Sequence, residues 1–218
     1  MEPNQSGIDI HNIRTDYVKA GLLEDQVKKD AIEQFLNWFN EALKSKVMEP
    51  NAMTIATVSN EGQPNARIVL LKGVDENGFV FFTNYNSKKG QEISENNKIA
   101  LLFFWPELER QVRVLGEVEK TSIQESETYF HSRPIGSQLG AWASQQSSKI
   151  DNRGIIEESL KLVKEKYDSK EIPLPDYWGG YRVIPQQIEF WQGRANRLHD
   201  RIVYKKTETS WELHRIAP

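Results

Sequence analysis

Hydrophobic residues near the start of the chain recur at the spacing of a helix. The pattern predicts a helix from about Asp30 to Lys46, with Asp30 as its N-cap. One apolar face of this helix would consist of Ile32, Phe35, Leu36, Phe39 and Leu43. After Pro50 the apolar period shortens from about 3.6 to about 2 residues, which is typical of β-strands.

Alternating positions after Pro50 predict several short strands separated by turns. Glu61-Gly62-Gln63-Pro64 is typical of a turn, and Gly78 in Asp75-Glu76-Asn77-Gly78 can adopt the positive φ of a hairpin. The expected strands are residues 53–59, 66–72, 79–83, 98–105, 111–119, 181–184, 187–192 and 201–205, with another at 211–215.

Helices are expected between these strands. Ser87 is a predicted N-cap, and Ser122 with Glu125 forms the S-x-x-E capping-box pattern at another helix start. The expected helices cover about residues 87–96, 122–132, a short stretch after Pro134, and 153–167. Short antiparallel strands with helices inserted between them predict an α+β fold built on a β-barrel.

No internal repeat or change of composition divides the chain. We therefore expect a single domain over residues 14–218, preceded by a flexible arm at residues 1–13 that shows no periodicity. The 218 residues are 38% hydrophobic and 27% charged, as in a globular protein. The formal net charge of −3 gives no electrostatic support for nucleic-acid binding.

Several absences narrow the function further. The chain contains no cysteine, which excludes disulfides, thiolate metal sites and a cysteine nucleophile. The histidines are scattered and no P-loop, G-x-G-x-x-G, H-E-x-x-H or G-x-S-x-G motif is present, so no metal is expected. Residues 1–12 lack the apolar core of a signal peptide, and the apolar run Ile99–Trp105 is too short to span a bilayer. We expect a cytoplasmic protein without membrane contact.

Basic side chains gather at predicted strand ends and helix starts. Arg67 and Lys72 bracket the apolar segment Ile68-Val69-Leu70-Leu71, either as solvated strand ends or as cations at the edges of a cleft for an anion. Lys88 and Lys89 lie at a predicted helix start, where cations oppose the helix dipole. A bound anion would resolve that conflict, and a solvated basic turn is the alternative.

A third cluster combines an aromatic and a basic residue. Tyr129 and Arg133 are four residues apart on a predicted helix and would share one face, with Ser137 at the next helix start. All three side chains can donate hydrogen bonds to a phosphate. A helix C-terminus also favours arginine on its own, so the structural alternative stays open.

The densest cluster lies in residues 189–201. Arg197, His199 and Arg201 are spaced two apart, so they would point to the same side of an extended segment, close to Trp191. So many charged groups beside an aromatic residue favour a binding or catalytic role over a purely solvated loop.

These motifs resemble the pyridoxamine 5′-phosphate oxidase family. The resemblance covers about residues 14–218. The matching segments, in chain order, are R-x-V-L-L-K at 67–72, L-E-R-Q-V at 108–112, Y-F-H-S-R-P at 129–134, S-Q-x-G-A-W at 137–142, P-L-P-x-[FY]-W-G-G at 173–180, E-F-W-Q-G at 189–193 and R-L-H-D-R at 197–201.

The resemblance implies a split β-barrel homodimer that binds FMN at the subunit interface. Positions that match the family's flavin contacts are Arg67, Ile68, Val69, Leu70, Leu71, Lys72, Phe82, Thr83, Lys88, Lys89, Gln111, Gln146, Ser147, Trp191 and Arg201. Positions that match its substrate contacts are Arg14, Tyr17, Lys72, Tyr129, Arg133, Ser137, Arg197 and His199, of which Arg197 and His199 are the expected catalytic pair. Departures from the commonest family residues are Thr15, Phe82 and Lys88.

The implied reaction oxidises pyridoxine 5′-phosphate and pyridoxamine 5′-phosphate to pyridoxal 5′-phosphate. A hydride would pass from C4′ to flavin N5, and O2 would reoxidise the flavin and give hydrogen peroxide. With the amine substrate, water would then hydrolyse the C4′ imine and release ammonia. Arg197 would position the substrate, and His199 would be a polar partner or a proton handler. Two alternatives stay open: another split barrel, such as a flavin or deazaflavin reductase or a haem-handling protein, and a non-catalytic carrier of pyridoxal phosphate or flavin.

Overall fold

The computed structural model describes residues 16–218, so the predicted arm, Arg14 and Thr15 lie outside the described residues. The helices are α1 (Ala31–Lys44), α2 (Lys88–Glu95), α3 (Ile123–Ser132), α4 (Ile135–Ala143) and α5 (Gly154–Lys166), with 3-10 turns η1 (Pro106–Leu108) and η2 (Ala195–Arg197). The strands are β1 (Ala52–Val58), β2 (Pro64–Leu70), β3 (Gly73–Asp75), β4 (Gly78–Asn84), β5 (Lys98–Trp105), β6 (Arg110–Lys120), β7 (Trp178–Gln192), β8 (Asp200–Lys206) and β9 (Trp211–Arg215).

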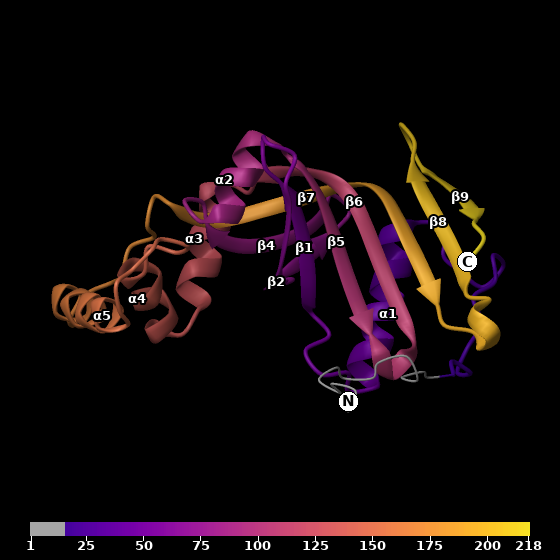
Figure 1. The fold of residues 1–218 in the computed structure, drawn as a ribbon, viewed down its shortest axis with the longest axis horizontal. Helices are drawn as coiled ribbons and strands as arrows, with labels where there is room; N and C mark the ends of the chain where they lie inside the picture. Colours follow the sequence, from indigo (N-terminus) through magenta and orange to yellow (C-terminus); the bar gives the residue numbers. More distant parts are fainter. Residues whose placement is uncertain (1–15) are drawn as a thin grey trace, which may run out of the picture.

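These strands form one antiparallel sheet in the order β2-β1-β5-β6-β7-β4-β3, with β8 beside β7 and β9 beside β8. The sheet curls into a half-barrel, and α3, α4 and α5 gather at one end of the molecule (Figure 1). This arrangement confirms the predicted α+β fold on an antiparallel barrel. Among residues 16–218, no helix combines the length and the apolar character needed to cross a bilayer.

The longest strand, β7, corrects one sequence prediction. The segments 181–184 and 187–192 were expected to be separate strands, but they belong to one strand that pairs with β6 from Tyr181 to Gln192. A register shift between Leu115 and Gly116 absorbs the interruption near Pro185, which faces Gly116. The short strand β3 was not predicted, because three residues are too few to show a period.

Helix α1 fills the inner side of the curled sheet. Phe35 is fully buried, and its ring centroid lies 4.9 Å from that of Phe79 in β4 and 5.0 Å from that of Phe103 in β5. The predicted N-cap is confirmed, since Asp30 Oδ1 accepts the backbone N–H groups of Ile32 and Glu33 at 2.8 and 3.0 Å.

The predicted apolar face of α1 is partly wrong. Leu36 and Leu43 are 37% and 52% exposed, whereas Trp38 and Ala42 are buried. The buried stripe runs through Phe35, Trp38 and Ala42 at spacings of three and four residues, and the two leucines lie just beside it.

A second, smaller core joins α3 and α4 to the start of β7, through Phe130, Leu139, Ile172 and Trp178. Ser122 caps α3 as predicted, because its hydroxyl accepts the backbone N–H of Glu125 at 3.1 Å. The carboxylate of Glu125 contacts Arg182 in β7 at 3.3 Å. The cap and this contact fix the start of α3 against β7.

Candidate functional site

A cleft of about 750 Å³ opens between β2, β4 and the helices α3 and α4. It brings together most of the positions predicted from the motifs. Predicted residues that line it are Arg67, Ile68, Val69, Leu70, Lys72, Phe82, Thr83, Lys89, Tyr129, Arg133, Ser137 and Gln146. Lining residues that the sequence did not indicate are Asn84, Gly140, Ala141, Ser144 and Trp178.

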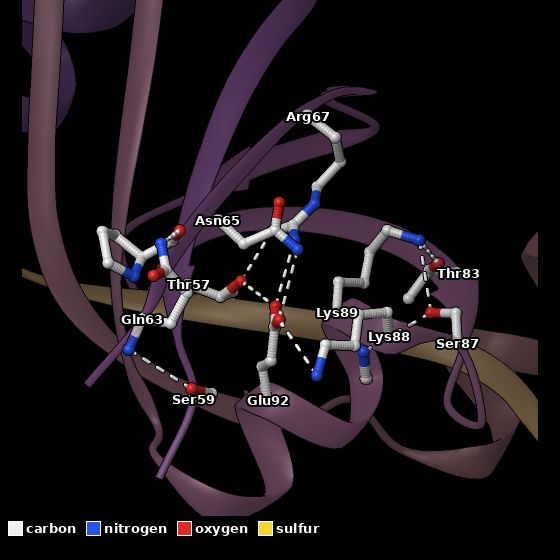
Figure 2. A network of polar contacts seen from close by, with 12 residues as sticks. Thr57, Ser59, Gln63, Asn65, Arg67, Thr83, Ser87, Lys88, Lys89 and Glu92 are labelled. Atoms are coloured by element: carbon white, nitrogen blue, oxygen red, sulfur yellow. Dashed lines mark hydrogen bonds and ion pairs between the residues drawn. The ribbon is translucent and has the colours of Figure 1, made fainter. Parts of the chain in front are cut away.

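Arg67 is held in the cleft by a buried carboxylate. Its Nη2 atom lies 3.0 Å from Oε2 of Glu92, and its Nη1 atom donates to Thr57 Oγ1 at 2.6 Å (Figure 2). Glu92 comes from α2 and is 2% exposed. Burial alone would raise the pKa of Glu92, but hydrogen bonds from Thr57, Asn65 and Arg67 outweigh it, so the pKa lies below its usual value. Arg67 is therefore fixed by a charged partner beneath it.

Lys89 also faces the cleft. Its Nζ atom lies 3.1 Å from Gln146 Oε1, 3.2 Å from Ser87 Oγ and 3.3 Å from Thr83 Oγ1, all of them neutral acceptors. Burial, and then the positive charge of Arg67, lower the pKa of Lys89. Two cations kept close together in this way favour a bound anion between them.

Lys88 does not line the cleft. It turns along α2 toward Glu92, at 3.8 Å, and its side chain is 61% exposed. The predicted N-cap Ser87 is confirmed, because its hydroxyl accepts the backbone N–H of Gly90 at 3.4 Å. Of the two lysines at this helix start, Lys89 is therefore the one placed to meet a ligand in the cleft.

The opposite wall of the cleft comes from α3 and the turn after it. Arg133 is the C-cap of α3, with φ −77° and ψ 150°, so the prediction that it shares a helical face with Tyr129 is wrong. Both residues nevertheless line the cleft, because the turn carries Arg133 over the ring of Trp178 at 4.5 Å. Phe82 stacks on Tyr129 with ring centroids 3.9 Å apart.

Arg133 has unused hydrogen-bonding capacity. Its Nη2 atom donates to the backbone oxygen of Ser137 at 2.9 Å, while its buried Nη1 atom has no partner among the described residues. Burial lowers the pKa of the guanidinium. A buried donor without a partner costs free energy, and an anionic oxygen in the cleft would satisfy it.

Four more of the predicted residues form a second group, which we call the Trp191 cluster: Tyr17, Trp191, Arg197 and His199. The ring of Trp191 lies 4.5 Å from His199 and 5.7 Å from Tyr17, centroid to centroid. His199 Nδ1 accepts the backbone N–H of Arg194 at 3.1 Å. Burial, and then the charge of Arg197, lower the pKa of His199, which favours the neutral ring.

Arg197 is displayed by a turn. It closes η2 with φ 61°, directly after Asn196 with φ 56°, so the prediction that Arg197, His199 and Arg201 share one side of an extended segment is wrong. Two successive residues with left-handed backbone are uncommon outside glycine, and such strain is concentrated at functional sites. Arg201 instead bonds Glu189 at 2.8 Å.

The last predicted positions are distributed over the fold. Gln111 in β6 pairs with Trp191, so it lies beside Trp191 on the neighbouring strand. Leu71 is buried in the core at 6% exposure, beside the cleft strand rather than in the cleft. Ser147 follows the cleft residue Gln146 and has φ 73°.

The cleft and the Trp191 cluster are far apart within one chain. Trp178 lines the cleft, and Trp191 lies thirteen residues further along the same strand β7. At a rise of about 3.3 Å per residue, that interval spans about 40 Å along the strand. None of the four residues of the Trp191 cluster lines the cleft.

The donors in the cleft fit a phosphate-bearing flat ring system. We call Arg67 and Lys89, whose charges act on each other, the first cationic end of the cleft. Lys72 and Arg133, which lie over the stacked rings of Tyr129 and Trp178, are the second. The unpartnered Nη1 atom of Arg133 favours an anionic ligand. FMN combines a phosphate with a planar ring, so the residues present suit this cofactor. Fold and cleft together define a split-barrel flavin-binding oxidoreductase.

Comparisons with known proteins give the family. Residues 39–167 match the pyridoxamine 5′-phosphate oxidase family, and residues 178–218 match the pyridoxine 5′-phosphate oxidase C-terminal dimerisation region. The chain therefore belongs to the pyridoxamine 5′-phosphate oxidase family, whose cofactor is FMN. The matched dimerisation region supports assembly as a homodimer.

Individual relatives are similar in sequence to this chain over nearly its whole length. The pyridoxine/pyridoxamine 5′-phosphate oxidase of Trichormus variabilis is 55% identical over 96% of this chain and 98% of its own. The pyridoxine/pyridoxamine 5′-phosphate oxidase of Burkholderia lata is 53% identical over 95% of this chain and 98% of its own. Among solved structures, PhzG from Burkholderia lata, in complex with tetrahydrophenazine-1-carboxylic acid, superposes with a TM-score of 0.85 at 25% identity over 90% of this chain and 98% of its own.

Proposed function

We propose that this protein oxidises pyridoxine 5′-phosphate and pyridoxamine 5′-phosphate to pyridoxal 5′-phosphate. The observation that carries the proposal is the cleft, because four cations line it, Arg67, Lys72, Lys89 and Arg133, which are enough to bind two phosphates, one of the cofactor and one of the substrate. Relatives at 53–55% identity that carry this activity in their names support the same conclusion.

The first cationic end would hold the phosphate of FMN. Arg67 is fixed by Glu92, and Lys89 is surrounded by neutral acceptors, so both can direct N–H groups to an anion. The chemistry that FMN supplies when bound is acceptance of a hydride from the C4′ carbon of the substrate, followed by reoxidation by O2 to give hydrogen peroxide.

The second cationic end would hold the substrate phosphate. Lys72 lies 5.9 Å from the centroid of the Tyr129 ring, and Arg133 offers its free Nη1 donor close by. Ser137, at the start of α4, adds a hydroxyl on the same wall. A phosphate fixed by three or four donors would place the substrate ring in one orientation, which is the main requirement for transfer from C4′.

The reacting end of the site would come from the partner subunit. Since the Trp191 cluster is too far along β7 to reach the cleft of its own chain, a homodimer would complete each cleft with the partner's cluster. Arg197 would position the substrate. His199 would be neutral, with Nδ1 accepting the N–H of Arg194, so its ring proton resides on Nε2 and can be donated to the substrate.

The test is turnover by purified holoenzyme. Oxygen consumption with FMN and pyridoxamine 5′-phosphate should be matched by formation of pyridoxal 5′-phosphate, followed by absorbance, and should collapse in Arg197→Met. No turnover despite tight FMN binding would contradict the proposal and favour a flavin reductase or a carrier. Tetrahydrophenazine-1-carboxylic acid, the ligand in the PhzG structure, is a second compound to test for turnover by this protein.

A further inference from the structure

We propose that Glu109 is a positioning residue that fixes residues 16–22, the N-terminal strap, against the Trp191 cluster. Tyr17 belongs to this strap, and its ring meets those of Trp191 and His199 edge-on, at centroid distances of 5.7 and 5.9 Å. The inference rests on the proposed function, because it concerns how Tyr17 is presented to the reacting end of that site.

Glu109 is a buried carboxylate whose partners are backbone groups of the strap. It is 5% exposed, and its Oε2 atom accepts the N–H groups of Val18 at 2.9 Å and Lys19 at 3.0 Å. Within residues 16–218 it forms no ion pair with a lysine or arginine side chain. A carboxylate is costly to bury, so these two charge-assisted bonds are what satisfy it, and they tie the strap to the end of η1.

The backbone around Glu109 brings Tyr17 close. Glu109 has φ 55° and ψ 39°, a left-handed conformation that is uncommon for a residue with a side chain. Its carbonyl oxygen accepts the N–H of Gly193 at 2.7 Å, and a Cβ added to Gly193 would lie 2.7 Å from Cγ of Tyr17. The contact between strap and cluster therefore has no room for a larger residue at 193.

The other end of the strap has its own anchors. The N–H of Leu22 donates to Asp200 Oδ2 at 3.1 Å, and the carbonyl of Leu22 accepts from Arg215 Nη2 at 2.6 Å. Arg194 Nη1 donates to the carbonyl of Ala20 at 3.3 Å. Loss of the Glu109 carboxylate would therefore loosen the end that carries Tyr17, leaving it the single hydrogen bond from Lys19 Nζ to the carbonyl of Glu107, while the Leu22 end stays attached.

The expected consequence is weaker substrate binding with little change in the chemical step. When the two bonds to Glu109 are lost, Tyr17 is free to leave the Trp191 cluster, and each turnover must first order the strap again. The free energy needed to order the strap reduces the population of protein that can bind substrate. KM therefore rises while kcat changes little. The cations proposed to hold the FMN phosphate, Arg67 and Lys89, have no contact with Glu109, so the effect should fall mainly on the substrate.

The experiment compares holoenzyme carrying Glu109→Ala with the matched control Glu107→Gln, an exposed glutamate two residues away. For Glu109→Ala, KM for pyridoxamine 5′-phosphate should rise about tenfold while kcat stays within about threefold. Trypsin should cut after Lys19 faster in this variant, detected by mass spectrometry. Glu109→Gln keeps one carbonyl oxygen as an acceptor and should recover most of the wild-type KM.

A double-mutant cycle separates positioning from general stability. If Glu109 acts through Tyr17, Glu109→Ala should raise KM very little when Tyr17→Ala is already present. Additive effects, or an unchanged KM and cleavage rate in Glu109→Ala, would overturn the inference. Absence of turnover in the wild type would instead refute the proposed function, and trypsin cleavage after Lys19 would still decide whether Glu109 holds the strap.

Discussion

Glu92 places a negative charge next to a cleft that is proposed to bind phosphate, which it would be expected to repel. The neighbours of the carboxylate explain why it does not. Its Oε2 atom accepts from Thr57 at 2.5 Å and Arg67 at 3.0 Å, and its Oε1 atom accepts from Asn65 at 3.2 Å. Every neighbour is a donor, so the carboxylate organises cations for the cleft rather than repelling the ligand (Figure 2).

Glu92→Gln should weaken FMN binding by at least about tenfold, because the new amide group turns a donor toward Asn65 or toward Thr57 and Arg67. The dissociation constant can be measured by quenching of flavin fluorescence. Glu95→Gln, at an exposed position on the same helix, should leave the constant within about twofold. Equal or tighter binding by Glu92→Gln would show that the carboxylate does not position Arg67.

His199 gives a pH dependence whose sign follows from its environment. Its pKa is lowered in the folded protein by burial and by Arg197, so folding favours the neutral ring. The stability it contributes is therefore present above its unfolded pKa of about 6.5 and is lost as pH falls through the lower folded value.

Between about pH 8 and about pH 5.5, the Tm of the wild type should fall further than that of His199→Asn, because only the wild type must protonate a ring that accepts the N–H of Arg194. Differential scanning calorimetry measures both. Parallel curves for the two proteins would contradict a perturbed His199.

At the scale of elements, α1 determines how well the half-barrel is filled. Phe35→Ala should lower the free energy of unfolding by about 3–5 kcal/mol, because it removes a fully buried ring that contacts β4 and β5. Leu43→Ala, on the same helix but 52% exposed, should cost less than about 1 kcal/mol. Urea unfolding of both variants makes the comparison, and similar costs would contradict the buried stripe described here.

Local signals made many elements predictable. Asp30 and Ser87 accept backbone N–H groups within their own helices, and β5 coincides with its predicted range 98–105. These features could be predicted because they depend on residues that are close in sequence. Strand β7 was divided in two because its continuity depends on pairing with β6, which lies about seventy residues earlier in the chain. The exposed Leu36 and Leu43 show the same limit, since helical spacing allows more than one apolar face.

In the site too, some features could be predicted from local sequence and others depend on contacts between distant segments. The motifs identified most of the residues that line the cleft, because their type and order are distinctive. Glu92 was not indicated, since a lone glutamate in a polar segment resembles a solvated one until the fold buries it. Glu109 and Trp178 lie within matching motifs, but their place beside the Trp191 cluster and in the cleft depends on the fold. The distance between the cleft and the Trp191 cluster could not be predicted either, because it depends on the length and continuity of β7.

At the scale of the whole molecule, the sharing of each site between two chains can be tested by mixing subunits. Arg133→Ala damages the cleft and Arg197→Met damages the Trp191 cluster, so each variant alone should be nearly inactive. Co-expressed in equal amounts, they should recover about a quarter of wild-type activity, because half of the dimers are mixed and each of these has one intact site. Activity of the co-expressed sample no higher than that of either variant would place both groups in the same subunit's site.

Strand β7 carries Trp178 at one end and Trp191 at the other, so in a dimer it would contribute to two different sites. The number of residues in β7 then sets the spacing between the two sites, so we expect it to change little during evolution. Side chains along it can be exchanged, but one inserted or deleted residue would turn all that follow to the opposite face and misalign both sites at once. Length variation should instead be tolerated in the turn between β8 and β9, at residues 207–210, which no part of either site uses.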